Sequence, residues 1–282
     1  VSFSNDITRA ARNAYVMGIT PEAVTKRVLE YAARRGQRRI AVVAPSDTYG
    51  KAASDAANGL ASYVGAQVVF TENYPADPND RPGRTAVAQI VGQRAQSFDA
   101  IFLPDTAEAG DMASLLYFYG VDPQRIQYLG VPIWDQQANQ LVSEQALLGA
   151  IYASPAERGF GTFQRSYKSA FGGEPHPLSS VAYDGVAMTL EIAARTPDPR
   201  FTNADLERPQ GFSGVDGPFA LRSDHRVERG MAIKRISSVG LELVEDAPAS
   251  LYRGSVSSVS STQTQQPSLS TTQTYTSPVT TS

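Results

Sequence analysis

The sequence predicts an α/β fold in which a mostly parallel β-sheet is flanked by helices. Two observations carry this prediction. Between residues 38 and 155, apolar runs of strand length alternate with helix-like segments, and one strand–helix–strand unit is complete within residues 39–70. Because parallel neighbours need a crossover connection, this alternation indicates a sheet that is covered on both faces.

The strand–helix–strand unit has clear boundaries. Residues 39–45 form an apolar run that ends in a polar loop, residues 51–64 carry small and apolar side chains on one face, and a second apolar run follows at residues 67–70. The loop offers Ser46 and Tyr49 and has no string of glycines. Loops at the carboxyl ends of parallel strands hold ligands in α/β proteins, so this one indicates a small-molecule pocket without a phosphate site.

The other elements follow the same periodicities. In the first block we expect strands at residues 38–45, 67–75, 99–104, 126–132 and 147–154, and helices at residues 50–64, 85–96 and 107–119. Residues 75–84 hold three prolines and a glycine, so they are predicted to be a loop. A second block is expected to have its own sheet, with helices at 161–171, 181–195 and near 203–212, and strands at 218–222 and 231–236.

The two ends of the chain differ from the rest. Residues 1–5 look like the end of a strand with nothing before it. From Gly254 onward the sequence has no acidic or basic residue and consists mainly of serine, threonine and glutamine. Such a segment buries too little apolar surface to offset its ordering entropy, so a disordered tail is predicted.

Composition excludes several classes of protein. The chain has 282 residues, 41% of them hydrophobic, with a formal net charge of −3, and its lysines and arginines are scattered, which argues against a nucleic-acid partner. It contains no cysteine, so disulfides, thiolate metal sites and cysteine nucleophiles are excluded. No run approaches the ~20 apolar residues of a membrane span.

No motif for catalysis, a cofactor or a metal is complete. Gly50 and Lys51 lack the flanking residues of a phosphate-binding loop, and the glycines of residues 211–217 fit a tight turn better than a dinucleotide site. His176 and His225 lie in polar loops, where a solvated side chain is the default. We therefore expect no catalytic residue, no cofactor and no metal ion.

Some polar and aromatic residues have two interpretations. Asp105 either takes part in acid–base work or, more in keeping with its position, caps the helix expected from Ala107. Trp134 follows the strand at 126–132 and either packs in the core or forms the wall of a pocket. Tyr49 favours the pocket. Ser46 and Asp47 have two compatible interpretations, as residues of the polar pocket rim and as caps of the next helix.

Several segments together resemble the type I periplasmic binding proteins, the leucine/isoleucine/valine-binding group. The resemblance covers residues 1 to about 250 and lies in Tyr49 and Gly50 after an apolar strand and in residues 107–120, 180–187 and 217–221. Within this group, four further segments are most similar to the branch of penicillin-binding protein activators: residues 31–39, 129–135, 211–217 and 227–232.

The resemblance implies two α/β lobes joined by crossing strands, with a ligand between them. On that pattern residues 1–19 are a remnant of the first lobe, 20–153 form the second lobe, 154–225 return to the first, 226–250 make the last crossing and further second-lobe strands, and 251–282 form the tail. The first lobe would then lack an opening portion of about 100 residues, so an N-terminally truncated chain is expected.

The resemblance also implies a ligand site. In amino-acid binders of this group a hydroxyl residue at the position of Ser4 and a tyrosine at the position of Tyr49 contact the ligand from opposite lobes. A second tyrosine falls near Asp105 and Thr106, and the ammonium-binding glutamate falls near Trp134, where Asp135 is the closest acid. The candidate ligand-binding residues are thus Ser2, Ser4, Asn5, Ser46, Tyr49, Asp105, Thr106, Trp134 and Asp135.

From the resemblance we expect a non-enzymatic protein of the periplasm or cell envelope, anchored to lipid through a segment before residue 1. The leading expectation is a regulator of cell-wall synthesis that resembles penicillin-binding protein activators and contacts a peptidoglycan synthase. The alternative is the solute-binding receptor of an ABC importer, with an ABC permease as partner. The expected ligand is small and polar, an amino acid or a peptidoglycan fragment.

Overall fold

The computed structural model describes residues 1–10, 14–176, 178–195 and 201–251. Its main sheet has seven strands in the order β2-β1-β3-β4-β5-β8-β9. The strands are β1 (Arg39–Pro45), β2 (Gln67–Tyr74), β3 (Ala100–Phe102), β4 (Gln127–Gly130), β5 (Ile151–Ser154), β8 (Ala232–Ser237) and β9 (Gly240–Glu245). The first five are parallel to one another, while β8 and β9 are antiparallel to their neighbours. The predicted α/β fold with a mostly parallel sheet is confirmed.

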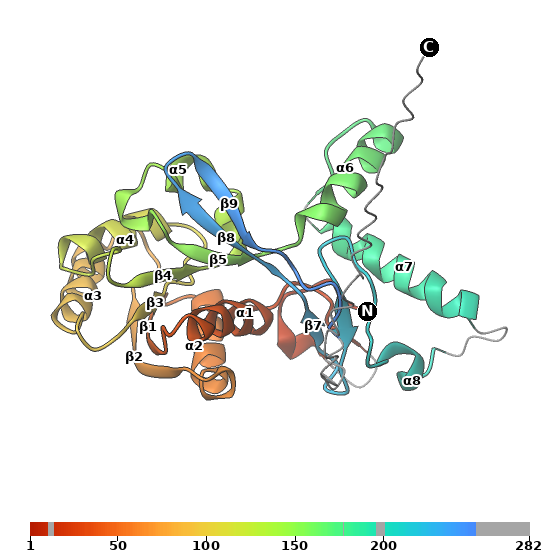
Figure 1. Ribbon diagram of the computed structural model, residues 1–282, viewed down its shortest axis with the longest axis horizontal. Coiled ribbons are helices and arrows are strands. Elements are labelled where there is room, and N and C mark those ends of the chain that lie inside the picture. Colours follow the sequence, from red (N-terminus) through yellow and green to blue (C-terminus); the bar gives the residue numbers. More distant parts are fainter. Residues whose placement is uncertain (11–13, 177, 196–200, 252–282) are drawn as a thin grey trace, which may run out of the picture. The chain divides into compact units, whose positions relative to one another are not determined.

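Helices cover both faces of the five parallel strands (Figure 1). Helices α1 (Pro21–Arg34) and α2 (Thr48–Leu60) lie side by side on one face, and α3 (Arg81–Gln93) and α4 (Ala109–Phe118) pack together on the other. This double cover explains the apolar runs in the sequence, since every residue of β1 except Arg39 is buried.

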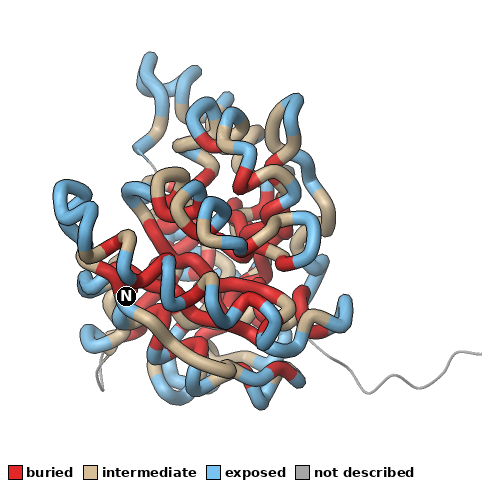
Figure 2. Tube along the Cα trace, turned by 90° about the vertical axis from the view of Figure 1, so that its left-hand side faces the viewer, coloured by how far each residue is buried: buried red, intermediate tan, exposed pale blue. Residues whose placement is uncertain are grey.

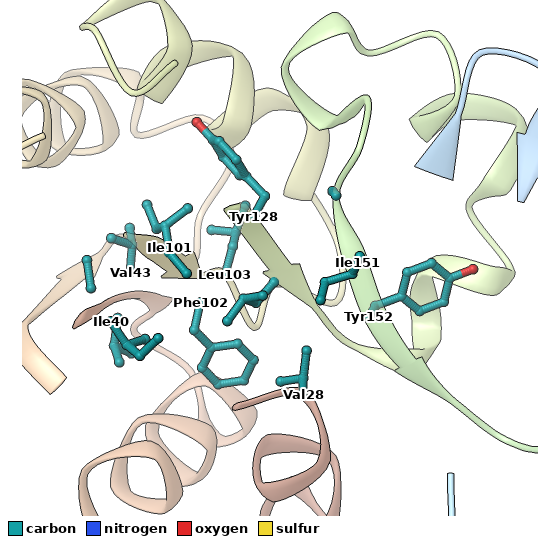
Figure 3. Packing of buried hydrophobic residues seen from close by; sticks show 14 of the residues in the cluster. Val28, Ile40, Val43, Ile101, Phe102, Leu103, Tyr128, Ile151 and Tyr152 are labelled. Carbon is teal, nitrogen blue, oxygen red and sulfur yellow. The ribbon is translucent and has the colours of Figure 1, made fainter. Parts of the chain in front are cut away.

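The main core lies between these layers. Side chains of β1, β3, β4 and β5 pack with Val28 of α1 (Figure 3), and the buried segments gather in the interior of the trace (Figure 2). Short helices complete this part of the chain: η2 (Ser62–Val64), η3 (Pro132–Asp135), α5 (Ala138–Leu141) and η4 (Gln145–Leu147).

A second, smaller core is built from the rest of the chain. It joins Tyr15 and Met17 to buried side chains of α7 (Ser179–Arg195), β6 (Phe219–Leu221) and β7 (Val227–Arg229). Strands β6 and β7 form a two-stranded sheet. The other elements of this part are η1 (Ile7–Arg9), α6 (Glu157–Phe171) and α8 (Asn203–Leu206).

Two sequence predictions are wrong. The loop expected at residues 75–84 ends early, because α3 begins at Arg81 with Asp80 as its cap, and Oδ1 of Asp80 accepts a hydrogen bond from the Gly83 amide at 3.0 Å. Pro82 fits the first turn, where its missing amide hydrogen is not needed. From periodicity alone, the strand expected at residues 231–236 was assigned to the sheet of the second block, but β8 pairs with β5 in the main sheet.

Other boundaries shift by a few residues. Helices α6 and α7 begin earlier than the predicted 161 and 181, and α8 ends at Leu206 instead of near 212. The turn predicted for residues 211–217 is confirmed, since Phe212 and Phe219 exchange backbone hydrogen bonds of 2.7 and 2.9 Å that close it. The predicted disordered tail lies outside the described residues. Within the described ranges, no helix combines the length and the apolar character that a membrane span requires.

Candidate functional site

The loops that follow β1, β3 and β4 meet at one edge of the main sheet, because these strands are parallel neighbours. Ser46 and Tyr49 follow β1, Asp105 and Thr106 follow β3, and η3 with Trp134 and Asp135 follows β4. The candidate residues from these three loops therefore share the edge at which parallel sheets hold ligands.

A hollow of about 450 Å³ opens at this edge, next to η3 and α5. Its lining is mostly polar and carries no formal charge, and consists of Thr106, Ile133, Gln136, Gln137, Asn139 and Gln140. We call it the carboxamide hollow. Gln137 Nε2 donates to the carbonyl oxygens of Thr106 and Ala107 at 3.1 and 3.3 Å, which joins the loop after β3 to η3 and α5. Its buried Oε1 has no partner within the described part of the chain.

Asp105 is buried and engaged in contacts within the protein. One carboxylate oxygen accepts from the amides of Ala107 and Glu108 at 2.7 Å, and the other accepts from the hydroxyl of Tyr74. These bonds hold the loop that leads into α4, which begins at Ala109. The sequence favoured Asp105 as the cap of this helix, but the capping residue of α4 is Glu108, and Asp105 instead holds the loop before the helix. Burial raises the pKa of Tyr74, and the charge of Asp105 raises it further.

Trp134 is completely buried in the main core. Its indole Nε1 donates to the carbonyl oxygen of Asp105 at 3.1 Å, and its ring lies 5.9 Å from that of Tyr152. Gly130 leaves room for it, because a Cβ atom there would lie 2.2 Å from the indole ring. Of the two interpretations of Trp134, core packing is the one that the structure shows.

Asp135 connects the end of β4 to β5 and β8. Its carboxylate accepts hydrogen bonds from Tyr152 at 2.8 Å and Ser154 at 2.6 Å, and forms an ion pair with Lys234 at 2.8 Å. Lys234 also pairs with Glu157 at 2.7 Å. Burial alone lowers the pKa of Lys234, but the two carboxylates outweigh burial and the net pKa is raised. A ligand ammonium would therefore compete with Lys234 for Asp135.

Tyr49 differs from these residues. It is half-buried and packs against the main core, but its hydroxyl forms no hydrogen bond with any residue that the structure describes. Burial raises the pKa of Tyr49, and the negative charges of Glu22 and Asp47 raise it further, so the hydroxyl is protonated at neutral pH. Ser46 is exposed and contributes its amide to the carbonyl oxygen of Tyr74 at 2.8 Å, while Asp47 caps α2.

Ser2, Ser4 and Asn5 lie with the second core. Ser2 forms a bridge to Val16, with backbone hydrogen bonds of 2.7 Å to Tyr15 and Met17. Ser4 Oγ accepts from the Asp6 amide at 3.0 Å, and Asn5 is exposed. No hydrogen bond in the described ranges joins these residues to the loops of the main sheet. Their role in a ligand site stays a prediction.

The histidines lie apart from this edge. His176 is exposed, as predicted. His225 differs from the prediction, because its ring lies 4.8 Å from that of Tyr15 and its Nδ1 is buried. Among the described residues, no group of three or more His, Cys, Asp or Glu side chains could hold a metal ion.

The sequence prediction missed most of the hollow. Four of its lining residues are carboxamides in a short run directly after η3: Gln136, Gln137, Asn139 and Gln140. The signal was present, because a run of amide side chains directly after a predicted strand, at the ligand-binding edge of the sheet, suggests a polar, uncharged surface.

Comparison with known proteins gives a family match and several proteins of similar fold. A sequence profile described as periplasmic binding protein matches residues 2–240. A putative branched-chain amino acid ABC transporter protein from Rhodospirillum rubrum is 17% identical, with a TM-score of 0.66, over 82% of this chain and 67% of the other. A leucine-binding protein from Thermotoga maritima is 15% identical, with a TM-score of 0.59, over 88% of this chain and 71% of the other.

A third solved structure has a different kind of ligand. It is a solute-binding protein of an ABC transporter from Rhodopseudomonas palustris in complex with 3,4-dihydroxybenzoic acid, 19% identical, with a TM-score of 0.53, over 83% of this chain and 66% of the other. At these identities the structures show a shared fold. This chain spans about two thirds of the length of these solved chains. No match is found among curated proteins.

Proposed function

Because this chain belongs to the periplasmic binding protein family, we propose that it is the solute-binding receptor of an ABC importer for an amino acid or a related small polar solute. Membership of this family implies a periplasmic location and a function in binding, without catalysis. The partner on this proposal is an ABC permease, which receives the solute after the two lobes close over it.

The observation that carries the proposal is the polar edge of the main sheet. It offers the carboxamide hollow and the free hydroxyl of Tyr49 at the place where α/β proteins bind ligands. Carboxamides donate and accept hydrogen bonds without carrying charge. The edge is therefore suited to a small solute with several hydrogen-bonding groups. The related solved structures include solute-binding proteins of ABC transporters, which favours this proposal over the cell-wall one.

The activator role was the leading expectation from the sequence, and it rests on four short segments, residues 31–39, 129–135, 211–217 and 227–232. The last two contain buried groups that hold the second core together. Arg229 pairs with Asp184 at 3.4 Å, and Asp216 accepts from Ser180 at 2.7 Å. Packing within the chain therefore accounts for these residues without a synthase partner. The activator role stays the second candidate.

A thermal-shift screen of the 282-residue chain tests the proposal. The probes are the common amino acids, hydroxybenzoates and soluble peptidoglycan fragments. A ligand that binds only the folded state raises the free energy of unfolding by mass action, by about 2.7 kcal/mol at a hundred times its dissociation constant, and so raises the melting temperature. We expect at least one free solute to raise it. Failure of all solutes, together with capture of a peptidoglycan synthase in a pull-down, would establish the activator role instead.

A variant pair tests whether the hollow takes part. Gln136→Ala with Gln140→Ala removes two exposed carboxamides of the hollow whose side chains form no hydrogen bond with other described residues. We expect weaker solute binding and an unchanged melting temperature of the free protein. Gln93→Ala with Gln124→Ala is the matched control, since both are exposed glutamines away from the hollow. Equal affinity in the two double variants would exclude the hollow from the site.

A further inference from the structure

Helices α1 and α2 begin at the same edge of the main sheet and lie side by side (Figure 1). Their first turns already have capping partners. Thr20 Oγ1 accepts from the Ala23 amide at 3.3 Å, and Asp47 Oδ1 accepts from the Gly50 amide at 2.6 Å. What distinguishes this corner of the sheet is therefore its side chains and not its helix ends.

Three side-chain oxygens in this corner have no partner among the described residues. Oε2 of Glu22 is buried and accepts no hydrogen bond, although it belongs to a carboxylate. Thr25 lies one turn further along α1, is fully buried, and its Oγ1 also has no partner. The hydroxyl of Tyr49, at the start of α2, is the third. Burying polar atoms without partners costs stability, so a feature of this kind suggests a function.

Glu22 and Tyr49 lie in the first turns of α1 and α2, two helices that pack against each other. After burial, the negative charge of Glu22 is the largest cause of the raised pKa of Tyr49, ahead of Asp47. The Tyr49 hydroxyl therefore stays protonated and can both donate and accept a hydrogen bond. The corner presents a carboxylate and a neutral hydroxyl together.

The cations of α1 are occupied elsewhere. Lys26 pairs with Glu228 at 3.0 Å, and Arg27 pairs with Glu245 at 2.8 Å. Glu22 forms no ion pair with any described residue. It differs in this from Asp105 and Asp135, which engage amides, hydroxyls and Lys234. Of these three acids at the ligand-binding edge, Glu22 is the one whose charge is left for a ligand.

We propose that Glu22, with Tyr49 beside it, binds a cationic amino group of the solute. The inference rests on the proposed receptor function and narrows it to solutes that carry an amine. The carboxylate pairs with the ammonium, and the Tyr49 hydroxyl supplies a further hydrogen bond to it. The sequence analysis named Asp135 as the acid closest to the position of the ammonium-binding glutamate in the amino-acid binders. Asp135 is paired with Lys234, whereas Glu22 forms no ion pair with a described residue.

Three probes that share one hydrocarbon body test the inference. L-Leucine carries an amine and a carboxylate, 3-methylbutylamine carries the amine alone, and 4-methylpentanoate carries the carboxylate alone. Titration calorimetry at neutral pH with the 282-residue chain should show binding of the first two. We expect 4-methylpentanoate to bind at least about tenfold more weakly than leucine, a difference of about 1.4 kcal/mol.

Two variants test whether Glu22 and Tyr49 bind the amine. Glu22→Gln keeps the shape of the side chain and should lower the affinity for both amine probes by at least about tenfold, while the melting temperature of the free protein does not fall. Tyr49→Phe should lower the affinity for both probes by a smaller factor. Asp55→Asn is the matched control: it removes the same charge from an exposed position on α2 and should change nothing.

The outcomes separate this inference from the receptor proposal. If 4-methylpentanoate or a hydroxybenzoate binds and neither amine probe does, or if Glu22→Gln binds leucine like the wild type, the amine subsite is wrong and the receptor function stands. If no solute of the wider screen binds at all, both are wrong.

Discussion

Lys234 of β8 forms an ion pair with Asp135 of η3 at 2.8 Å, and this contact joins the last parallel strands of the main sheet to the antiparallel strand that follows them. The lysine side chain is only 9% exposed and the aspartate 27%. Asp135 also accepts hydrogen bonds from Tyr152 and Ser154 on β5. The acid that the sequence assigned to a ligand thus has a structural role.

Asp135→Ala should therefore destabilise the fold. The substitution leaves the ammonium of Lys234 and the hydroxyls of Tyr152 and Ser154 without their acceptor, and each poorly solvated group left unpaired costs about 1–3 kcal/mol. Since Asp135 is partly exposed, we expect a total loss of about 2 kcal/mol, measured by urea unfolding at neutral pH. Asp55→Ala breaks an exposed ion pair with Lys51 and should cost less than about 1 kcal/mol. Equal losses in the two variants would contradict the structural role.

The pH dependence of stability should contain a contribution from Asp184. Burial raises the pKa of Asp184 from 3.8 to about 6, although the Val215 amide and Arg229 lower it. Between these two values the folded chain holds a proton that the unfolded chain has released. The stability from this group is thus complete below pH 3.8 and is lost as the pH rises through about 6. The full change is about 3 kcal/mol.

Comparing the wild type with Asp184→Asn isolates the contribution of Asp184 to the pH dependence of stability. The other carboxylates titrate in both proteins, so their contributions cancel in the difference. Asp99, Glu228 and Glu245 have lowered pKa values, so their stabilising effect is lost only as the pH falls further, below the normal range of carboxylates. Urea unfolding at a series of pH values should show wild-type stability falling relative to the variant as the pH rises towards 6. A constant difference between the two proteins would refute the assignment. Asp216, whose pKa burial also raises, keeps its carboxylate in both.

Much of the fold was readable from the sequence because buried parallel strands are continuous apolar runs. Strand β1 was placed within one residue for this reason. The pairing of β8 was not readable from periodicity, since an apolar run does not specify which strand lies beside it. Helix α1, β7 and β9 were not among the elements predicted from periodicity, and the missing α1 explains why Glu22 was not considered for the site.

The site was harder to predict than the fold, because whether a polar side chain is free to bind a ligand depends on residues that are far from it in the sequence. The sequence shows that Asp105 and Asp135 are acids at the right edge of the sheet. It does not show that Tyr74, 31 residues from Asp105, and Lys234, 99 residues from Asp135, bind them. Tertiary contacts decide which polar groups remain free for a ligand, and a single sequence gives no register between such segments.

The packing of Trp134 against Gly130 makes a sharp prediction about the core. A Cβ atom at Gly130 would lie 2.2 Å from the indole ring, so Gly130→Ala forces the ring or the backbone of β4 to move. Overpacking of this kind costs about 1–3 kcal/mol. Gly59→Ala is the matched control, since that position on α2 is exposed and has open space, and it should stabilise by up to about 1 kcal/mol. Thermal unfolding should show a lower melting temperature for Gly130→Ala and a higher one for Gly59→Ala than for the wild type.

Helices α6 and α7 expose an apolar surface that should make the 282-residue chain associate with itself. Tyr183, Val186 and Leu190 on α7 follow helical spacing and are 56%, 60% and 64% exposed. Phe163 of α6 extends the surface, with its ring 5.4 Å from that of Tyr183, and no α6 side chain that the structure describes is buried. Contiguous apolar surface of this kind is normally covered by protein, and in a solution of this chain alone another copy is available.

Sedimentation velocity over a range of micromolar concentrations tests this expectation. The wild type should show concentration-dependent association, and the double variant Val186→Glu with Leu190→Lys should remove it, because burying either charge in an apolar contact is unfavourable. Val239→Glu is the control: Val239 is 89% exposed between β8 and β9, away from this surface, and its substitution should leave the association unchanged. A wild type that stays monomeric throughout, or an association that survives the double variant, would show that the α6–α7 surface does not drive contact between copies.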